Sequence, residues 1–157
     1  MSLLLGYVSV WIVLFAWASF IDLKSFILPD WLTLPLILSG MVFNALSVDN
    51  FCSMTDSLLG VLIGYGLIRL VDECYFKLKK QRGIGQGDAK LLAAIGAILG
   101  WQSIFPILCC SAILGVVVGL ILIRFKRLTL QHQIPFGPFL SLFACAFMLE
   151  KVLLPVR

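Results

Sequence analysis

Residues 83–96 read GIGQGDAKLLAAIG, so that a carboxylate stands between a glycine-rich segment and an apolar run. Three glycines in five positions, Gly83, Gly85 and Gly87, tolerate positive φ values and a close approach by another part of the chain. Asp88 lies where the apolar run begins, and that run has the composition of a membrane helix. An acid is costly in such a position unless it is used, which makes Asp88 a candidate functional residue.

The composition around this stretch is that of a membrane protein. Of the 157 residues, 61% are hydrophobic and only 13% are charged, and the mean hydropathy is +1.07. The apolar residues come in blocks that are long enough to cross a bilayer. We therefore expect one all-α, polytopic membrane domain over residues 1–157, with about six transmembrane helices.

Polar segments separate the six apolar blocks. The first five blocks cover residues 3–21, 31–46, 58–76, 88–100 and 105–123, and the sixth ends near residue 154. Gly60 and Gly64 share one face of the third block and predict close helix packing. The fourth block rises only about 20 Å, less than the roughly 30 Å hydrocarbon core, so a carboxylate at its start needs a wet cavity and partners.

Lysine and arginine are distributed unevenly between the two sets of loops. The richer side collects nine of them: Lys24, Lys77, Lys79, Lys80, Arg82, Lys90, Arg124, Lys126 and Arg127. The other side has Lys151 and Arg157, and Arg69 lies inside the third block. Because basic loops stay in the cytoplasm, we expect the richer side to be cytoplasmic and both chain ends to lie outside the cytoplasm. Asp22, at the end of the first block, then shares the cytoplasmic face with Asp88.

Two aspartates on one membrane face are the groups that an aspartic protease needs. One carboxylate activates a water molecule while the other donates a proton to the carbonyl or the leaving nitrogen. Plainer interpretations are a helix N-cap for Asp88 and a solvated acid paired with Lys24 for Asp22. Asp30, beside Pro29, is expected to cap the second helix.

Other polar residues are expected to have ordinary roles. Lys90 is more often a snorkelling lysine than a catalytic one. Arg69 is expected to pair with Asp72 or Glu73. The acids predicted on the opposite face are interpreted as solvated residues: Asp49, Asp56 and Glu150.

Several kinds of site are disfavoured by the sequence. The five cysteines form no C-x-x-C pair and His132 is the sole histidine, so we predict no metal site. His132 also has no acidic or serine neighbour for a triad. The glycine-rich segment follows no strand and lacks Gly-Lys-Ser/Thr, which argues against nucleotide binding. No nucleic-acid motif is present, and we predict no cofactor.

Four motifs occur in order on the predicted helices. They are Asp22-x5-Leu28-Pro29-Asp30, Gly85-Gln86-Gly87-Asp88-Ala89-Lys90-Leu91, Gly96-Ala97 with Gly100-Trp101, and Pro135-Phe136-Gly137-Pro138-Phe139-Leu140. Together these segments resemble the bacterial type IV prepilin peptidases, GxGD-type aspartic proteases of the inner membrane. The resemblance extends from Ile21 to Leu142, nearly the whole chain.

The resemblance implies a function and a set of site residues. The catalytic aspartates of the family fall on Asp22 and Asp88, and the supporting loop residues fall on Gly85, Gly87, Lys90, Pro135, Phe136, Gly137 and Pro138. The implied substrates are prepilins and pseudopilins of type IV pili and type II secretion, whose leader is cleaved after a glycine. Cleavage takes place on the cytoplasmic side of the inner membrane, so both termini of this chain would be periplasmic.

One feature departs from many members of that family. They carry a further region with paired C-x-x-C motifs and also N-methylate the new terminus with S-adenosylmethionine. This chain begins at the first predicted catalytic helix and has no such cysteines, so methyltransferase activity is not assigned. The alternatives to a peptidase are an inactive paralogue and a small transporter that uses paired intramembrane carboxylates.

Overall fold

A computed structural model describes residues 2–25, 28–47, 50–80, 85–125 and 135–154 as a bundle of antiparallel and parallel helices. The helices are α1 (Ser2–Ser25), α2 (Asp30–Leu46), α3 (Met54–Lys79), α4 (Gln86–Leu99), α5 (Ile104–Arg124) and α6 (Gly137–Leu153), with a 3-10 turn η1 (Trp101–Ser103) before α5. All six expected blocks are therefore helical. Three helical stretches are long and apolar enough to cross a membrane: residues 4–25, 54–78 and 101–124. The chain is an all-α, multi-pass membrane protein.

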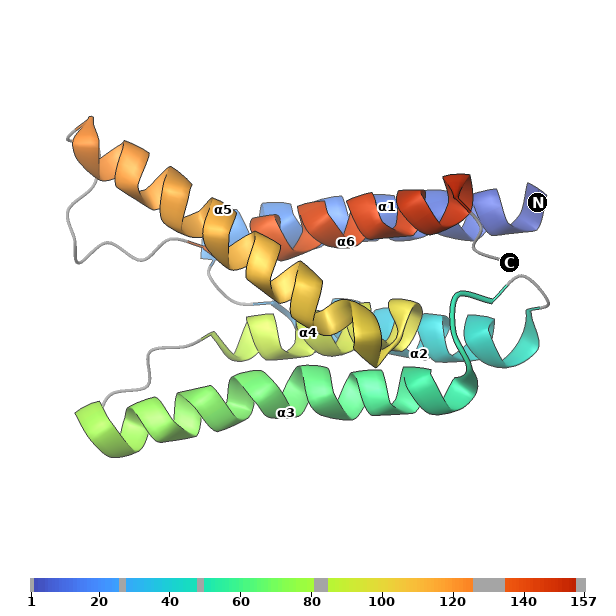
Figure 1. Cartoon of the computed structure of the whole chain (residues 1–157), viewed down its shortest axis with the longest axis horizontal. Helices are drawn as coiled ribbons and strands as arrows, with labels where there is room; N and C mark the ends of the chain where they lie inside the picture. The colour runs from blue at the N-terminus through green and yellow to red at the C-terminus, as the bar shows by residue number, and fades with distance from the viewer. Residues whose placement is uncertain (1, 26–27, 48–49, 81–84, 126–134, 155–157) are drawn as a thin grey trace.

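The helices alternate in direction, so their ends gather at two ends of the bundle (Figure 1). We call the end where α1, α3 and α5 finish and α2, α4 and α6 begin the aspartate end, and the other the opposite end. Lys24, Lys77, Lys80, Lys90 and Arg124 lie at the aspartate end. Arg82, Lys126, Arg127, His132 and Arg157 lie outside the described residues.

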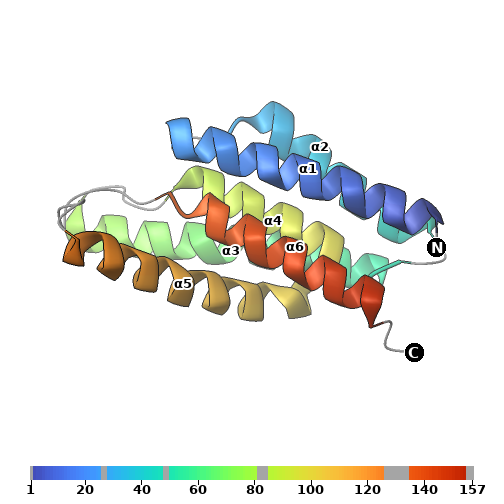
Figure 2. The ribbon, with the colours of Figure 1, turned by 90° about the horizontal axis from the view of Figure 1, so that it is seen from above.

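Helix α4 is the centre of the bundle. It packs against α3, α2, α6 and α5, and Figure 2 shows it between the α1–α2 pair and the α3–α5 pair. Every residue from Leu91 to Leu99 is buried. A helix that is apolar on all sides must be enclosed by other helices, which explains why the shortest of the six lies inside.

Glycines let α3 and α4 touch through their backbones. A Cβ added at Gly60 would lie 2.2 Å from the carbonyl oxygen of Gly96, and one at Gly64 would lie 2.6 Å from that of Leu92. No side chain fits at such distances, so both positions require glycine. The expectation of close packing on the Gly60–Gly64 face is confirmed.

The last turn of α4 is held by side chains from other helices. Its last four carbonyl groups have no partner within the helix, and inside a membrane water does not supply one. Asn44 Nδ2 donates to the oxygens of Ala97 and Ile98 at 2.9 and 3.0 Å, and Ser57 Oγ donates to Ala97 at 2.6 Å. Lys151 Nζ and Ser103 Oγ donate to Leu99 at 3.2 and 3.1 Å.

The remaining carbonyl oxygen of this turn, that of Gly96, accepts a hydrogen bond from the N–H of Gly100 at 2.9 Å. Gly100 has a φ of 86°, the left-handed conformation that glycine adopts at helix ends. Cys52 lies beside Gly100; burial raises the pKa of its thiol to about 11. The thiol is therefore protonated at neutral pH, and it donates weakly to Ile98.

An acid expected to be solvated has a structural role at the opposite end. Asp56 Oδ2 accepts the hydroxyl of Ser53 at 2.6 Å, and the Asp56 N–H returns a bond to Ser53 Oγ. Trp101 Nε1 donates to Asp56 Oδ1 at 3.1 Å. Asp56 stays partly exposed, as expected of a solvated acid, but it also links the start of α3 to the turn after α4.

Candidate active site

Asp22 lies in the last turn of α1 and is buried, with 5% of its surface exposed. Helix α1 continues to Ser25, so Asp22 is inside the helix rather than after it. Its Oδ2 atom accepts the backbone N–H of Gly137 at 2.9 Å. Gly137 is the first residue of α6, where N–H groups have no partner within the helix. The carboxylate of Asp22 is thus fixed by the beginning of α6 and does not pair with Lys24, whose Nζ lies over the Phe20 ring.

The contact between Asp22 and α6 requires a glycine. A Cβ on Gly137 would lie 2.6 Å from Asp22 Oδ2. Pro138 follows in the first turn of α6, a position where proline loses no hydrogen bond. Phe136 precedes Gly137, and the centroid of its ring lies 6.4 Å from the centroid of the Phe139 ring. The Pro135–Pro138 segment therefore brings a backbone donor to Asp22.

Asp88 is the third residue of α4, and its N–H donates to the carbonyl oxygen of Gly85 at 3.1 Å. The N-cap position belongs to Gly85, so the interpretation of Asp88 as the N-cap was wrong. The buried Oδ1 atom of Asp88 has no hydrogen-bond partner in the part of the chain that the structure describes. The charges of Asp88 and Asp22 are close enough to interact.

The glycines before Asp88 serve close approach. A Cβ on Gly85 would lie 2.8 Å from Asp88 Oδ2, and one on Gly87 would lie 3.0 Å from the N and Cβ atoms of Leu28. Leu28 belongs to the segment between α1 and α2, and it is buried. Neither glycine has a positive φ, so only the close-approach half of the expectation is confirmed; Gly83 lies outside the described residues.

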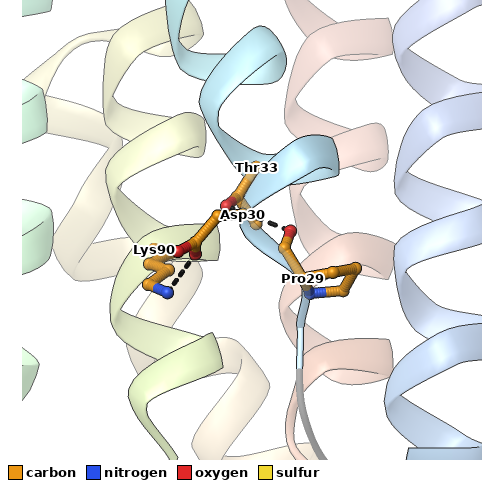
Figure 3. Close-up of polar contacts among 4 residues, drawn as sticks. All are labelled: Pro29, Asp30, Thr33 and Lys90. Atoms are coloured by element: carbon orange, nitrogen blue, oxygen red, sulfur yellow. Dashed lines mark hydrogen bonds and ion pairs between the residues drawn. The ribbon is translucent and has the colours of Figure 1, made fainter.

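Lys90 and Asp30 join the first turns of α4 and α2. Lys90 Nζ forms an ion pair with Asp30 Oδ1, and Figure 3 shows the two side chains meeting between the helices. Asp30 does lie in the first turn of α2, but Pro29 occupies the N-cap position and no side chain caps the helix. The expected capping role of Asp30 was wrong, because Asp30 is the first residue inside α2 and its carboxylate pairs with Lys90. Thr33 Oγ1 instead donates to the Pro29 carbonyl at 3.4 Å.

Two contacts of α4 were not predicted from the sequence. Leu28 contacts Gly87 beside Asp88, and the buried side chain of Asn44 lies at the opposite end of the helix. A polar side chain inside an apolar block is a signal that would have identified Asn44. Arg69 does pair with Asp72, as expected, at 3.9 Å. Among the described residues, no three His, Cys, Asp or Glu side chains lie close enough to hold a metal ion.

Comparison with known proteins identifies a family and several relatives of this chain. The model of the type IV leader peptidase family matches residues 9–120, which include Asp22 and Asp88 but not the Pro135–Pro138 segment. A prepilin leader peptidase/N-methyltransferase of Aeromonas hydrophila is 38% identical over 146 residues, which cover 90% of this chain and 50% of the relative. The protein of that name from Dickeya chrysanthemi is 36% identical over 121 residues, covering 77% and 42%.

The chain spans about half the length of the curated relatives it matches. A relative with the same name from Xanthomonas campestris is 38% identical over 149 residues, covering 85% of this chain and 51% of its own. No solved structure matches the chain significantly. The family match and these identities establish that the chain belongs to the type IV leader peptidase family.

Proposed function

We propose that the protein is a membrane aspartic endopeptidase that removes the leader peptide of type IV prepilins or pseudopilins by cleavage after a glycine. Asp22 and Asp88 are the proposed catalytic residues. The observation that carries the proposal is their convergence: α1 and α4 bring two buried or half-buried carboxylates within interaction distance at one end of the bundle.

In the proposed mechanism the two carboxylates hold one proton between them. The ionised member takes a proton from a water molecule, whose oxygen attacks the scissile carbonyl carbon, and the protonated member donates to the carbonyl oxygen. Collapse of the tetrahedral intermediate breaks the C–N bond: the leaving nitrogen takes the proton that the first carboxylate removed from water, and the second carboxylate recovers the proton that it gave to the carbonyl oxygen. The unpartnered Oδ1 of Asp88 is the atom that we propose binds the water.

Neighbouring residues are proposed to support this chemistry. The Gly137 N–H orients Asp22, and Gly85 and Gly87 leave space around Asp88 and Leu28. Pro135, Phe136 and Pro138 are proposed to fix the start of α6. Lys90 is proposed to fix the start of α4 against α2 through its ion pair with Asp30. Because glycine has no side chain, Gly85 and Gly87 would also allow an extended substrate to lie close to the backbone of the enzyme.

The proposed orientation puts the aspartate end at the cytoplasmic face of the bacterial inner membrane. Five basic residues at that end support it: Lys24, Lys77, Lys80, Lys90 and Arg124. The beginning of α1 and the end of α6 then face the periplasm. The proposal does not extend to N-methyl transfer, although the names of the relatives include it.

Cleavage of a prepilin by membranes that contain this chain tests the proposal. We expect leader removal by the wild-type chain and none by Asp22→Asn or Asp88→Asn at equal protein levels. Glu73→Gln is the matched control, since Glu73 is an exposed acid near the same end. Cleavage that survives either aspartate change excludes that residue from the mechanism. Failure of the wild-type chain on several prepilins favours an inactive paralogue or a small transporter that uses the paired intramembrane carboxylates.

A further inference from the structure

Two parallel helices carry the two halves of the candidate site. Helix α4 begins with the turn that contains Asp88, and α6 begins with Gly137, whose N–H holds Asp22. The two helices are in contact and run in the same direction (Figures 1 and 2). Their relative position along the bundle therefore sets how the two carboxylates face each other.

Lys151 joins these helices at the opposite end. It lies in the last turn of α6 and is half-buried. Its Nζ donates to the carbonyl oxygen of Leu99, the last residue of α4, at 3.2 Å. It also donates to the carbonyl oxygen of Phe51, between α2 and α3, at 3.0 Å. A cation at the C-terminal end of a helix is favoured by the helix dipole.

A helix carries such a restraint along its length. Its hydrogen bonds keep the rise near 1.5 Å per residue, so Asp88 lies about 17 Å from Leu99 along the axis and an axial shift at Leu99 moves Asp88 as well. The Gly60–Gly96 contact restrains α4 against α3. The Lys151–Leu99 bond, in contrast, restrains α4 directly against α6.

We propose that Lys151 is a positioning residue for the candidate site: by tying the end of α4 to the end of α6, it sets the register in which Asp88 faces Asp22. This inference rests on the proposed function. Ser57, which donates to Ala97 from α3, stabilises the same turn of α4 by a bond to α3 rather than to α6. A comparison of Lys151 and Ser57 variants therefore distinguishes an effect on the position of α4 relative to α6 from an effect on stability alone.

The experiment compares full-length variants in membranes with a prepilin that the wild-type chain cleaves. For Lys151→Met we expect kcat to fall by about 10- to 100-fold with KM nearly unchanged, because small misplacements of reacting groups are costly. Lys151→Arg retains donors and is expected to restore most of kcat. Ser57→Ala is expected to lower the thermal unfolding midpoint with kcat unchanged, and Glu150→Gln, a change of the exposed neighbouring residue, to alter neither.

A second measurement does not depend on catalysis. In a chain whose five native cysteines are replaced by serine, Asp22→Cys and Asp88→Cys are joined by a short bis-methanethiosulfonate, which forms a disulfide with each thiol and releases methanesulfinate. We expect Lys151→Met to lower the yield of the cross-link several-fold and Ser57→Ala to leave it unchanged. If Lys151→Met does not accumulate, Lys151→Gln, which keeps a donor on a shorter side chain, takes its place in both measurements.

The possible results are distinct. A kcat and a cross-link yield that match those of Ser57→Ala overturn the positioning role of Lys151. If no prepilin is cleaved by the wild-type chain, the proposed function fails, and the cross-link yield alone decides whether Lys151 sets the register of α4 and α6.

Discussion

The first and last turns of α4 are separated by about 20 Å and built in opposite ways. In the last turn, the carbonyl oxygens of residues 96–99 all accept hydrogen bonds, mostly from side chains of other helices. In the first turn, Asp88 has a buried oxygen without a partner in the described chain, and glycines take the place of side chains around it. Hydrogen bonding is thus concentrated at the end that carries no proposed chemistry.

This difference indicates that the two ends of α4 have different roles. A buried polar group that is left unsatisfied is costly, so it persists only where the rest of the fold is stable enough to tolerate it. The last turn of α4 supplies such stability, and the first turn keeps a carboxylate available. Changes in the first turn of α4 should therefore affect activity and changes in the last turn stability, except at Lys151, whose bond to Leu99 also sets the register of α4 and α6.

The largest expected effect is on activity at the aspartate end. Asp88→Ala should lower cleavage by about 10³-fold or more, since a proton-transfer group is lost. It should not lower the thermal unfolding midpoint, because Oδ1 of Asp88 has no partner to lose. Cleavage kinetics and thermal unfolding of the purified chain measure the activity and the unfolding midpoint. A large drop in the midpoint would contradict the contrast between the two ends of α4.

The second effect tests the contact that fixes Asp22. Gly137→Ala should lower kcat/KM by about 10- to 100-fold, since the new Cβ would lie 2.6 Å from Asp22 Oδ2 and displace it. Gly66→Ala is the matched control, because no atom outside its own helix lies within 4 Å of a Cβ there. Equal activities of the two variants would show that the Gly137 contact is dispensable.

The third effect belongs to the opposite end and should appear in stability. Asn44→Ala removes donors from Ala97 and Ile98 and an acceptor from the Phe51 N–H. We expect the free energy of unfolding to fall by about 3 kcal/mol, since buried polar groups lose their partners. Asn50→Ala serves as control, because the exposed Asn50 donates only weakly to the Asn44 carbonyl oxygen, at 3.4 Å, and its loss leaves the bonds of Asn44 to Ala97 and Ile98 in place. An unchanged stability of Asn44→Ala would mean that the last turn of α4 is not held as described.

The smallest effect is expected at the Lys90–Asp30 ion pair. The side chains are 29% and 61% exposed, so either Lys90→Met or Asp30→Asn should cost less than about 1 kcal/mol of stability. The exchanged pair, Asp30→Lys with Lys90→Asp, should recover most of any loss. Thermal unfolding at low and high salt measures the stability of each variant. A loss of several kcal/mol in the free energy of unfolding would contradict the small role expected of an exposed ion pair.

Local features of the sequence predicted much of this fold. The apolar blocks predicted six helices, and the alternation of direction then predicted that Asp22 and Asp88 share one end. Gly60 and Gly64 predicted the close packing of α3 because they recur on one helix face. These features depend on hydrophobicity and helical periodicity, which are properties of neighbouring residues.

Other roles were misassigned because they depend on residues distant in the sequence. Asp30 was expected to cap its own helix but pairs with Lys90 of α4. Lys151 was assigned to the opposite face, and it does lie at that end, but its bond to the end of α4 was not predicted. Neither partner is visible in the local sequence, since a long side chain reaches whatever group the packing brings near it.

The sequence by itself determined that this chain is a helical membrane protein with two acids at the same face, because burial of apolar blocks and the direction of successive helices leave few alternatives. Only the tertiary structure decided which groups hold those acids and the ends of α4. The Gly137 N–H reaches Asp22, and Asn44, Ser57 and Lys151 reach the last carbonyls of α4, because hydrogen bonds require contact within about 3 Å. Such contacts are fixed by the packing of all six helices and not by any one of them.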